Sequence, residues 1–360
     1  MMKLNLKKFN ILSKKPIPVD EFIEKILYKP RVGYYSNKNP FGKNGDFITS
    51  PTISNLFSEI IGIWLVSTWE KMGKPKKFNF IELGPGDGSL TKVIISTLKN
   101  FPELNKAIKI YLYEKSLFLK KLQKQNIDNK RIKWIKNFNS IKKGPVIFFG
   151  NEFFDAIPIK QFSNINNELF EKCYSVKDNI DIIEKFIRSN KKDVAQIMTF
   201  GTLKKLKFIE FPKKGLIELN PIIKKINKLS GGILLIDYGY LNSNNSNTIQ
   251  AVMGNKKISA ETMLKNLGKA DITSLVNFNL LKEYFLKNNL KVKNVVTQRF
   301  FLERMGIIKR AQILEKKKTY EEQKYMKETL SRLLEEKQMG SLFKVIFGYK
   351  NKNNNFFGFE

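Results

Sequence analysis

The 360-residue sequence contains no histidine and a single cysteine, Cys173. Without histidine the chain cannot form a Ser-His-Asp triad, a histidine general base or a histidine metal ligand. One cysteine cannot close an internal disulfide, which favours a reducing compartment, and the lack of both residue types argues against a zinc site. We therefore expect no metal centre, and a location in a bacterial cytoplasm or, for a eukaryotic chain, in the mitochondrial matrix.

Long apolar runs are also missing, and acidic residues are few. No apolar span reaches roughly 18 residues and the lysine-rich N-terminus has no long apolar region, so we expect no transmembrane helix and no secretory signal. Acidic residues number 33 against 65 lysines and arginines, giving a net charge of +32. Two interpretations of this charge stay open: a surface for nucleic acid, or scattered solvated lysines from an AT-rich coding bias that also favours Asn, Ile and Phe.

Residues 78–90 pass from an apolar run into three glycines at alternate positions: Gly84, Gly86 and Gly88. A helical pattern follows from residue 89 to about residue 98, and strand, glycine turn and helix in this order open a nucleotide-binding α/β unit. The dinucleotide pattern G-x-G-x-x-G is incomplete, because Ser89 stands at its sixth position. Counted from Glu82, the pattern acid-x-Gly-x-Gly-x-Gly resembles motif I of the class I methyltransferases that use S-adenosylmethionine (SAM). The alternative is a glycine-rich turn without a ligand.

A second acid, Glu114, ends the next apolar run, at residues 108–113. A carboxylate at the end of a strand can accept hydrogen bonds from both hydroxyls of a ribose, although a solvated strand-end glutamate is the simpler alternative. The residues that we predict to bind SAM are Glu82, Gly84, Pro85, Gly86, Gly88 and Glu114, with Asp46 from the glycine-rich loop of residues 42–51 and Asn151 as further candidates.

A continuous apolar strand is expected at residues 145–149, and polar residues follow it. Because ligands of open α/β sheets lie beyond the carboxyl ends of the strands, Asn151, Glu152 and Asp155 fall where chemistry is expected. Asp237 ends the strand expected at residues 232–236 in the same way. Glu152 and Asp155 share one side if a helical turn begins there; the alternative is polar capping of a loop. We predict Glu152, Asp155 and Asp237 as catalytic residues.

Strands alternate with helices along the chain, which predicts an α/β fold with a mostly parallel sheet. Helices are expected at Val19–Tyr28 and near residues 53–72, 116–125 and 319–336. Further strands are expected near residues 131–135, 291–297 and 342–349. We interpret residues 164–229, rich in Lys and Asn with weak strands at 169–174 and 216–219, as an inserted subdomain that forms a lid or faces the substrate.

The predicted organisation is a Rossmann-like methyltransferase core of residues 76–163 and 230–350. N-terminal helices and a cofactor-covering loop (residues 1–75) precede it, and a tail (residues 351–360) follows. Stretches spread over nearly the whole chain resemble one family, the MidA family of SAM-dependent methyltransferases. The most specific of them are Glu-Leu-Gly-Pro-Gly at residues 82–86 and Asn-Glu-Phe-Phe-Asp-Ala-Ile-Pro at residues 151–158.

The resemblance implies transfer of methyl groups from SAM to arginine in a protein, because mitochondrial members of the family methylate a core subunit of respiratory complex I and assist its assembly. The chain differs from the family at Leu275 and Asn277, where relatives commonly carry His and Asp, and at Thr52, where they often carry Glu. An arginine acceptor requires carboxylates that hold the cation and take its proton, the role expected for Glu152, Asp155 and Asp237. Two other classes stay open: a nucleic-acid methyltransferase, and a non-catalytic SAM-binding assembly factor.

Overall fold

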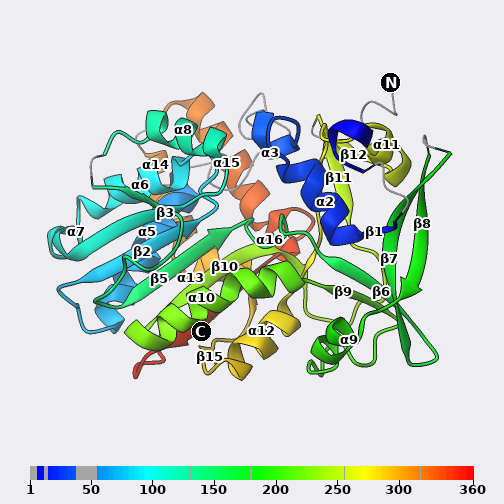
Figure 1. Ribbon diagram of the computed structural model, residues 1–360. Helices are drawn as coiled ribbons and strands as arrows, with labels where there is room; N and C mark the ends of the chain where they lie inside the picture. The colour runs from blue at the N-terminus through cyan, green and yellow to red at the C-terminus, as the bar shows by residue number, and fades with distance from the viewer. Residues whose placement is uncertain are drawn as a thin grey trace.

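The computed structural model describes residues 6–11, 15–37, 55–129, 131–178, 181–254, 256–316 and 318–360. A nine-stranded sheet forms the centre of the described chain, in the order β15-β17-β10-β5-β2-β3-β4, with β14 beside β10 and β16 beside β17 (Figure 1). Its strands are β2 (Phe78–Leu83), β3 (Ile108–Tyr113), β4 (Lys133–Ile135), β5 (Val146–Asn151), β10 (Gly231–Tyr240), β14 (Val276–Asn277), β15 (Lys291–Val292), β16 (Val296–Thr297) and β17 (Phe343–Lys350). The predicted α/β class and Rossmann-like sheet are confirmed.

The strands that matter for the site run parallel. β2 lies between β3 and β5, and β10 lies on the other side of β5, all in parallel register, whereas β17 is antiparallel to β10. Residues 146–149 of β5 are buried throughout, because helices cover both faces of the sheet. The carboxyl ends of β2, β3, β5 and β10 therefore meet along one edge.

Two apolar cores flank the sheet. The first core includes Trp64, which is fully buried and meets the ring of Phe347 edge-on at a centroid distance of 5.2 Å. Helices of this face are α5 (Asn55–Lys71), α6 (Ser89–Leu98), α13 (Gln298–Arg304), α14 (Ile307–Glu315), α15 (Tyr320–Leu334) and α16 (Met339–Leu342). The second core lies under α10 (Lys213–Leu229) and α12 (Phe278–Lys287). Helix α7 (Pro102–Ala107) directly precedes β3, and α8 (Leu117–Asn126) follows it.

Two predicted strands differ from the structure. The strand expected near residues 291–297 is divided into β15 and β16. The weak strand expected at residues 216–219 lies inside the helix α10. Its buried residues recur at helical spacing and form a single apolar face toward the sheet: Gly215, Leu216, Leu219, Ile222, Ile223 and Ile226. Burial of this face outweighs Gly215 and Pro221, which disfavour a helix locally.

A second, antiparallel sheet lies beside the first (Figure 1). It consists of β1 (Ile17–Pro18), β6 (Lys160–Ile165), β7 (Glu168–Lys177), β8 (Asp181–Arg188) and β9 (Phe208–Phe211), with α9 (Lys191–Ile197) before β9. A three-stranded sheet of β11 (Gln250–Met253), β12 (Lys256–Ile258) and β13 (Asp271–Thr273) packs with α11 (Ala260–Lys265). Helices α2 (Val19–Tyr28) and α3 (Tyr34–Asn37) span the top between the two larger sheets.

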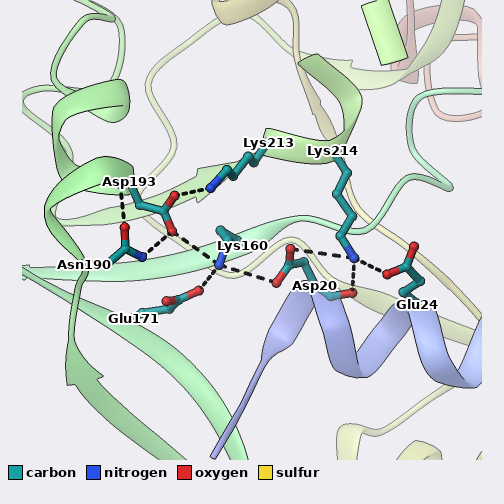
Figure 2. A network of polar contacts seen from close by, with 8 residues as sticks. All are labelled: Asp20, Glu24, Lys160, Glu171, Asn190, Asp193, Lys213 and Lys214. Carbon is teal, nitrogen blue, oxygen red and sulfur yellow. Dashed lines mark hydrogen bonds and ion pairs between the residues drawn. The ribbon is translucent and has the colours of Figure 1, made fainter. Parts of the chain in front are cut away.

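Buried ion pairs join α2 to the second sheet (Figure 2). Lys160 on β6 forms a hydrogen bond with Glu171 and lies 3.4 Å from Asp193 and 3.7 Å from Asp20. Lys213 and Lys214 of α10 complete the network through Asp193 and Asp20. The network places α2, and therefore its last residue Tyr28, relative to both the insertion and α10.

The predicted division into domains stays a prediction. Apart from β1, the strands of the second sheet run from Lys160, within the range assigned to the core, to Phe211, within the range assigned to the insertion. At the C-terminus Phe356 and Phe359 are buried against Phe347, so the residues predicted as a tail pack on the first core. In the part of the chain that the structure describes, every helix is too short or too polar to span a membrane.

Candidate active site

The loop between β2 and α6 adopts a backbone that residues other than glycine rarely accept. The φ angles are +61°, +58° and +86° for Gly84, Gly86 and Gly88. The N–H of Gly84 donates to the carbonyl of Tyr113 at 3.0 Å, which ties the loop to the end of β3. A Cβ on Gly84 would lie 3.1 Å from the ring of Phe153, and Gly84 is exposed while Pro85 is buried. The loop therefore offers uncovered backbone beside the end of β5.

Glu82 lies on β2 two residues before the loop, with 4% of its surface exposed. The hydroxyl of Thr91 on α6 donates a hydrogen bond to its Oε2. Burial raises the pKa of Glu82 to about 8, and the hydrogen bond from Thr91 offsets only part of this rise. Glu82 thus joins β2 to the first turn of α6 and carries a proton more often than not at neutral pH.

Glu114 follows β3 and is tied to the glycine loop through a glutamine. The N–H of Ser116 donates to Oε1 of Glu114 at 2.7 Å, and Nε2 of Gln123 donates to Oε2 at 3.1 Å. The same Nε2 donates to the carbonyl of Gly86 at 2.8 Å. Burial raises the pKa of Glu114. Gln123 is fully buried and was not predicted, because no sequence pattern distinguishes it from other polar residues of α8.

These residues fit the nucleoside part of SAM. Both oxygens of Glu114 accept hydrogen bonds from the protein, and a carboxylate has about four acceptor positions, so hydroxyls of a ribose could also be bound. The uncovered backbone at Gly84 leaves room for a ligand against the main chain. The SAM contacts stay predictions, and Asp46 lies outside the described residues.

The loop after β5 differs from the prediction. β5 continues to Asn151, and Glu152 then turns the chain with a φ of +50°. The N–H of Glu152 donates to the carbonyl of Ile236 at 2.9 Å, and residues 152–155, all described, form no helix. The condition for placing Glu152 and Asp155 on one side, a helical turn that begins there, is therefore not met, because the chain stays paired to β10 through Glu152.

Asp237 on β10 holds this loop by its backbone. Its Oδ2 accepts hydrogen bonds from the N–H groups of Phe154 at 2.8 Å and Asp155 at 3.2 Å. Its Oδ1 accepts from the N–H of Tyr238 at 2.9 Å. Burial raises the pKa of Asp237 to about 7 despite these bonds. Both oxygens of Asp237 are therefore engaged with backbone N–H groups, and Oδ2 holds the loop after β5.

Asp155 and Asn151 have acceptor oxygens that no described donor satisfies. Asp155 is 6% exposed, and its Oδ1 is buried without a hydrogen-bond partner among the described residues. Burial raises the pKa of Asp155, and the negative charges of Asp237 and Asp271 raise it further. Oδ1 of Asn151 is likewise buried and unsatisfied, while its Nδ2 donates to Oε1 of Glu152 at 3.0 Å.

Two tyrosines and an acid complete the site from distant parts of the chain. The hydroxyl of Tyr35 donates to Oδ2 of Asp271 at 2.8 Å, and the hydroxyl of Tyr28 donates to the carbonyl of Ala156 at 2.8 Å. The rings of Tyr28 and Tyr35 stack with centroids 5.3 Å apart. The carbonyl of Tyr35 accepts the hydroxyl of Ser116 at 3.0 Å, which links this group to the Glu114 loop. The two tyrosines and Asp271 were not predicted as site residues.

A small pocket opens beside Asp155. Apolar and hydroxyl side chains line the rest of it, including Ile23, Ile157 and Thr273. Throughout the described ranges, no three His, Cys, Asp or Glu side chains cluster in a way that could hold a metal ion.

Sequence comparisons identify similar proteins over most of the chain. A family model described as "Putative S-adenosyl-L-methionine-dependent methyltransferase" matches residues 60–296. The chain is 29% identical to the mitochondrial protein arginine methyltransferase NDUFAF7 of Xenopus laevis, over 93% of this chain and 82% of the relative. It is also 29% identical to the homologue of that enzyme in Caenorhabditis elegans, over 95% of this chain and 85% of the relative.

Structural comparison supports the fold. A Burkholderia thailandensis protein crystallised with S-adenosyl-homocysteine superimposes with a TM-score of 0.81 at 18% identity, over 99% of this chain and 93% of the other. A second crystal structure from the same organism gives a TM-score of 0.82 at 19% identity, over 99% of this chain and 94% of the other. The similarity includes the second sheet as well as the nine-stranded sheet, because it covers nearly the whole chain.

Proposed function

The chain belongs to the family of SAM-dependent methyltransferases whose model matches residues 60–296, and on this premise we propose that it methylates arginine in a protein. The relatives named above are protein arginine methyltransferases and are similar over more than nine-tenths of this chain. The observation that carries the proposal is a buried carboxylate with an unsatisfied oxygen, Asp155, beside a loop suited to SAM.

On the cofactor side, the proposed contacts are Glu82, Gly84, Pro85, Gly86, Gly88 and Glu114. When bound, SAM supplies an electrophilic methyl group on a sulfonium. Glu114 would hold the ribose through the free acceptor positions of its two oxygens. Gln123 fixes the position of Glu114 relative to the glycine loop, because its Nε2 donates hydrogen bonds to both.

On the acceptor side, the protein has to hold a cation and take its proton. The guanidinium of arginine stays protonated near neutral pH, so a carboxylate must accept the proton as the nitrogen is methylated. Asp155 suits this task, because its raised pKa makes its ionised form a stronger base than an exposed aspartate, and the positive charge of a bound guanidinium favours that ionised form. Glu152 is a second candidate, while Asp237 would act by positioning the loop that carries Asp155.

The substrate is proposed to be a protein, with a subunit of a complex I-type enzyme as the specific candidate. A reducing compartment, either a bacterial cytoplasm or the mitochondrial matrix, suits the single cysteine. The net charge of +32 supports the alternative of a nucleic-acid acceptor. The other alternative, a non-catalytic assembly factor, predicts SAM binding without methyl transfer.

The test uses tritiated SAM and an extract of cells that lack the protein. We expect label in a protein band that resists nuclease, disappears with protease and yields methylarginine after acid hydrolysis. Glu114→Ala should weaken SAM binding by about tenfold or more, as expected for loss of a bidentate acceptor. Gly84→Val is a poorer variant, because the φ of +61° strains any branched residue there. Nuclease-sensitive label, or no label, would overturn the proposal.

A further inference from the structure

The end of β5 carries two buried oxygens that lack a donor among the described residues, Oδ1 of Asn151 and Oδ1 of Asp155. Buried acceptors of this kind lower stability and are rare in folded proteins unless a ligand, ion or water supplies the donor. The amide of Asn151 is oriented by its bond to Glu152, which leaves the carbonyl oxygen for a partner. The loop is therefore prepared for a ligand rich in hydrogen-bond donors.

Asp237, another carboxylate at this edge of the sheet, already binds backbone N–H groups through both oxygens. Asp237 accepts three backbone N–H groups through its two oxygens, and two of these groups belong to Phe154 and Asp155. A ligand that took the place of the N–H groups of Phe154 and Asp155 on Asp237 would break the bonds that hold the β5 loop. Asp237 is for this reason a positioning residue, which fixes where Asp155 lies.

Asp271 faces the same space from the other side. The N–H of Ser274, which directly follows β13, donates to the carbonyl of Asp155 at 3.2 Å, so the end of β13 lies close to the β5 loop. The hydroxyl of Tyr35 and the N–H of Ile272 both bind Asp271, each at 2.8 Å. Asp271 is 3% exposed, and its charge acts on Asp155.

We propose that Asn151, Asp155 and Asp271 form one subsite that holds the guanidinium of the acceptor, with Tyr35 as the residue that positions Asp271. This assignment rests on the proposed function and moves Asn151 from the cofactor side to the acceptor side. A guanidinium carries five N–H donors and no acceptor, which matches a subsite made of acceptor oxygens. A neutral amide or urea brings a carbonyl oxygen toward the same acceptors and is disfavoured.

The test measures binding to the full-length protein saturated with S-adenosyl-homocysteine, so that no turnover occurs. The probe is Nα-acetyl-arginine N-methylamide, and its uncharged counterpart is Nα-acetyl-citrulline N-methylamide, which has the same shape. We expect the arginine probe to bind about tenfold more tightly than the citrulline probe, the scale of one charge-assisted contact.

Single substitutions test which residues belong to the subsite. Asp155→Asn, Asp271→Asn and Asn151→Ala should each weaken the arginine probe by about tenfold, with affinity for S-adenosyl-homocysteine within about twofold of the unaltered protein. Tyr35→Phe removes one hydroxyl and should reduce the ratio of the affinity for the arginine probe to the affinity for the citrulline probe. A purely structural defect would weaken the binding of both probes equally. The matched control is Glu210→Gln, a buried carboxylate whose partners are Gln161 and Thr248; it should leave the ratio unchanged.

The outcomes separate the subsite from the proposed function. Equal affinity of the two probes for the unaltered protein overturns the subsite. Loss of S-adenosyl-homocysteine binding in Asn151→Ala, with the arginine probe retained, returns Asn151 to the cofactor side and overturns the assignment. If the unaltered protein forms methylarginine but every variant keeps the same ratio of affinities for the two probes, the proposed function stands and the subsite alone is overturned.

Discussion

Several acidic side chains at the candidate active site are buried, and burial disfavours their ionised form. Glu82 is the clearest case, because burial raises its pKa from 4.5 to about 8 while Thr91 supplies a single hydrogen bond. In the folded protein Glu82 binds a proton over a pH range in which the unfolded chain has lost it. The free energy of unfolding must then fall as the pH rises through this range.

The predicted effect of Glu82 on stability follows from the two pKa values. Its stabilising contribution is fully present below about pH 4.5 and is lost as the pH rises to about 8. The loss amounts to about 3–5 kcal/mol at about 1.4 kcal/mol per pKa unit. Glu82→Gln should flatten this part of the profile, measured by urea unfolding of the cofactor-free protein between about pH 5 and 8.

A control variant distinguishes Glu82 from the general effect of removing a charge. Glu103→Gln removes an acid whose side chain is 75% exposed and should leave the slope of the profile unchanged. If Glu82→Gln and Glu103→Gln give the same slope as the unaltered protein, Glu82 is ionised in the folded state and the interpretation fails.

At the scale of elements, the position of α2 depends on the buried ion pairs of Figure 2. Burial disfavours the charge of Lys160, yet its hydrogen bond to Glu171 and the charges of the neighbouring acids raise its pKa to about 12. Asp20, the second residue of α2, takes part in the network, and Tyr28 at the other end of α2 reaches Ala156 beside the β5 loop. The network therefore connects the insertion to the candidate active site.

Lys160→Met is predicted to destabilise the protein by about 3–5 kcal/mol, because it leaves buried carboxylates without their central cation. Urea unfolding measures the change. Arg188→Ala breaks an ion pair with Glu168 in the same sheet, but both side chains are more than half exposed, so it should cost about 0–1 kcal/mol. Adding Glu171→Leu to Lys160→Met should restore part of the loss. A cost for Lys160→Met as small as that for Arg188→Ala would contradict the central role of Lys160.

For the molecule as a whole, the net charge of +32 is the dominant electrostatic property. Self-repulsion among lysines destabilises the compact state, while surface ion pairs stabilise it only weakly. Salt screens both effects, so the sign of the salt dependence shows which effect is larger.

Repulsion is predicted to be larger than the attraction within ion pairs. The melting temperature should rise by about 2 °C or more as NaCl increases from about 0.05 to 0.5 M. Sodium chloride is preferred to sulfate, which stabilises most proteins by exclusion from their surface. A melting temperature that falls with added NaCl would mean that ion pairs outweigh the repulsion. Binding of a mixed-sequence RNA that weakens steeply over the same range would instead favour the nucleic-acid alternative.

The sequence by itself determined the elements and part of the candidate site. β3 (Ile108–Tyr113) and α6 (Ser89–Leu98) begin and end where their patterns predict, because apolar spacing and glycine breaks act over a few residues. Glu82, Glu114 and Asp155 could be singled out because parallel strands bring their carboxyl ends to one edge. That rule needs the order of elements along the chain and no knowledge of tertiary contacts.

Only the tertiary structure decided which groups meet across that edge. Tyr35 and Asp271 are 236 positions apart and come together because α2 and α3 span two sheets. The roles of Asp155 and Asp237 diverge for the same reason: both are buried acids near strand ends, but backbone N–H groups bind both oxygens of Asp237, whereas Oδ1 of Asp155 has no partner among the described residues. A side chain's hydrogen-bond partners depend on how distant segments pack, and local sequence patterns carry no record of that packing.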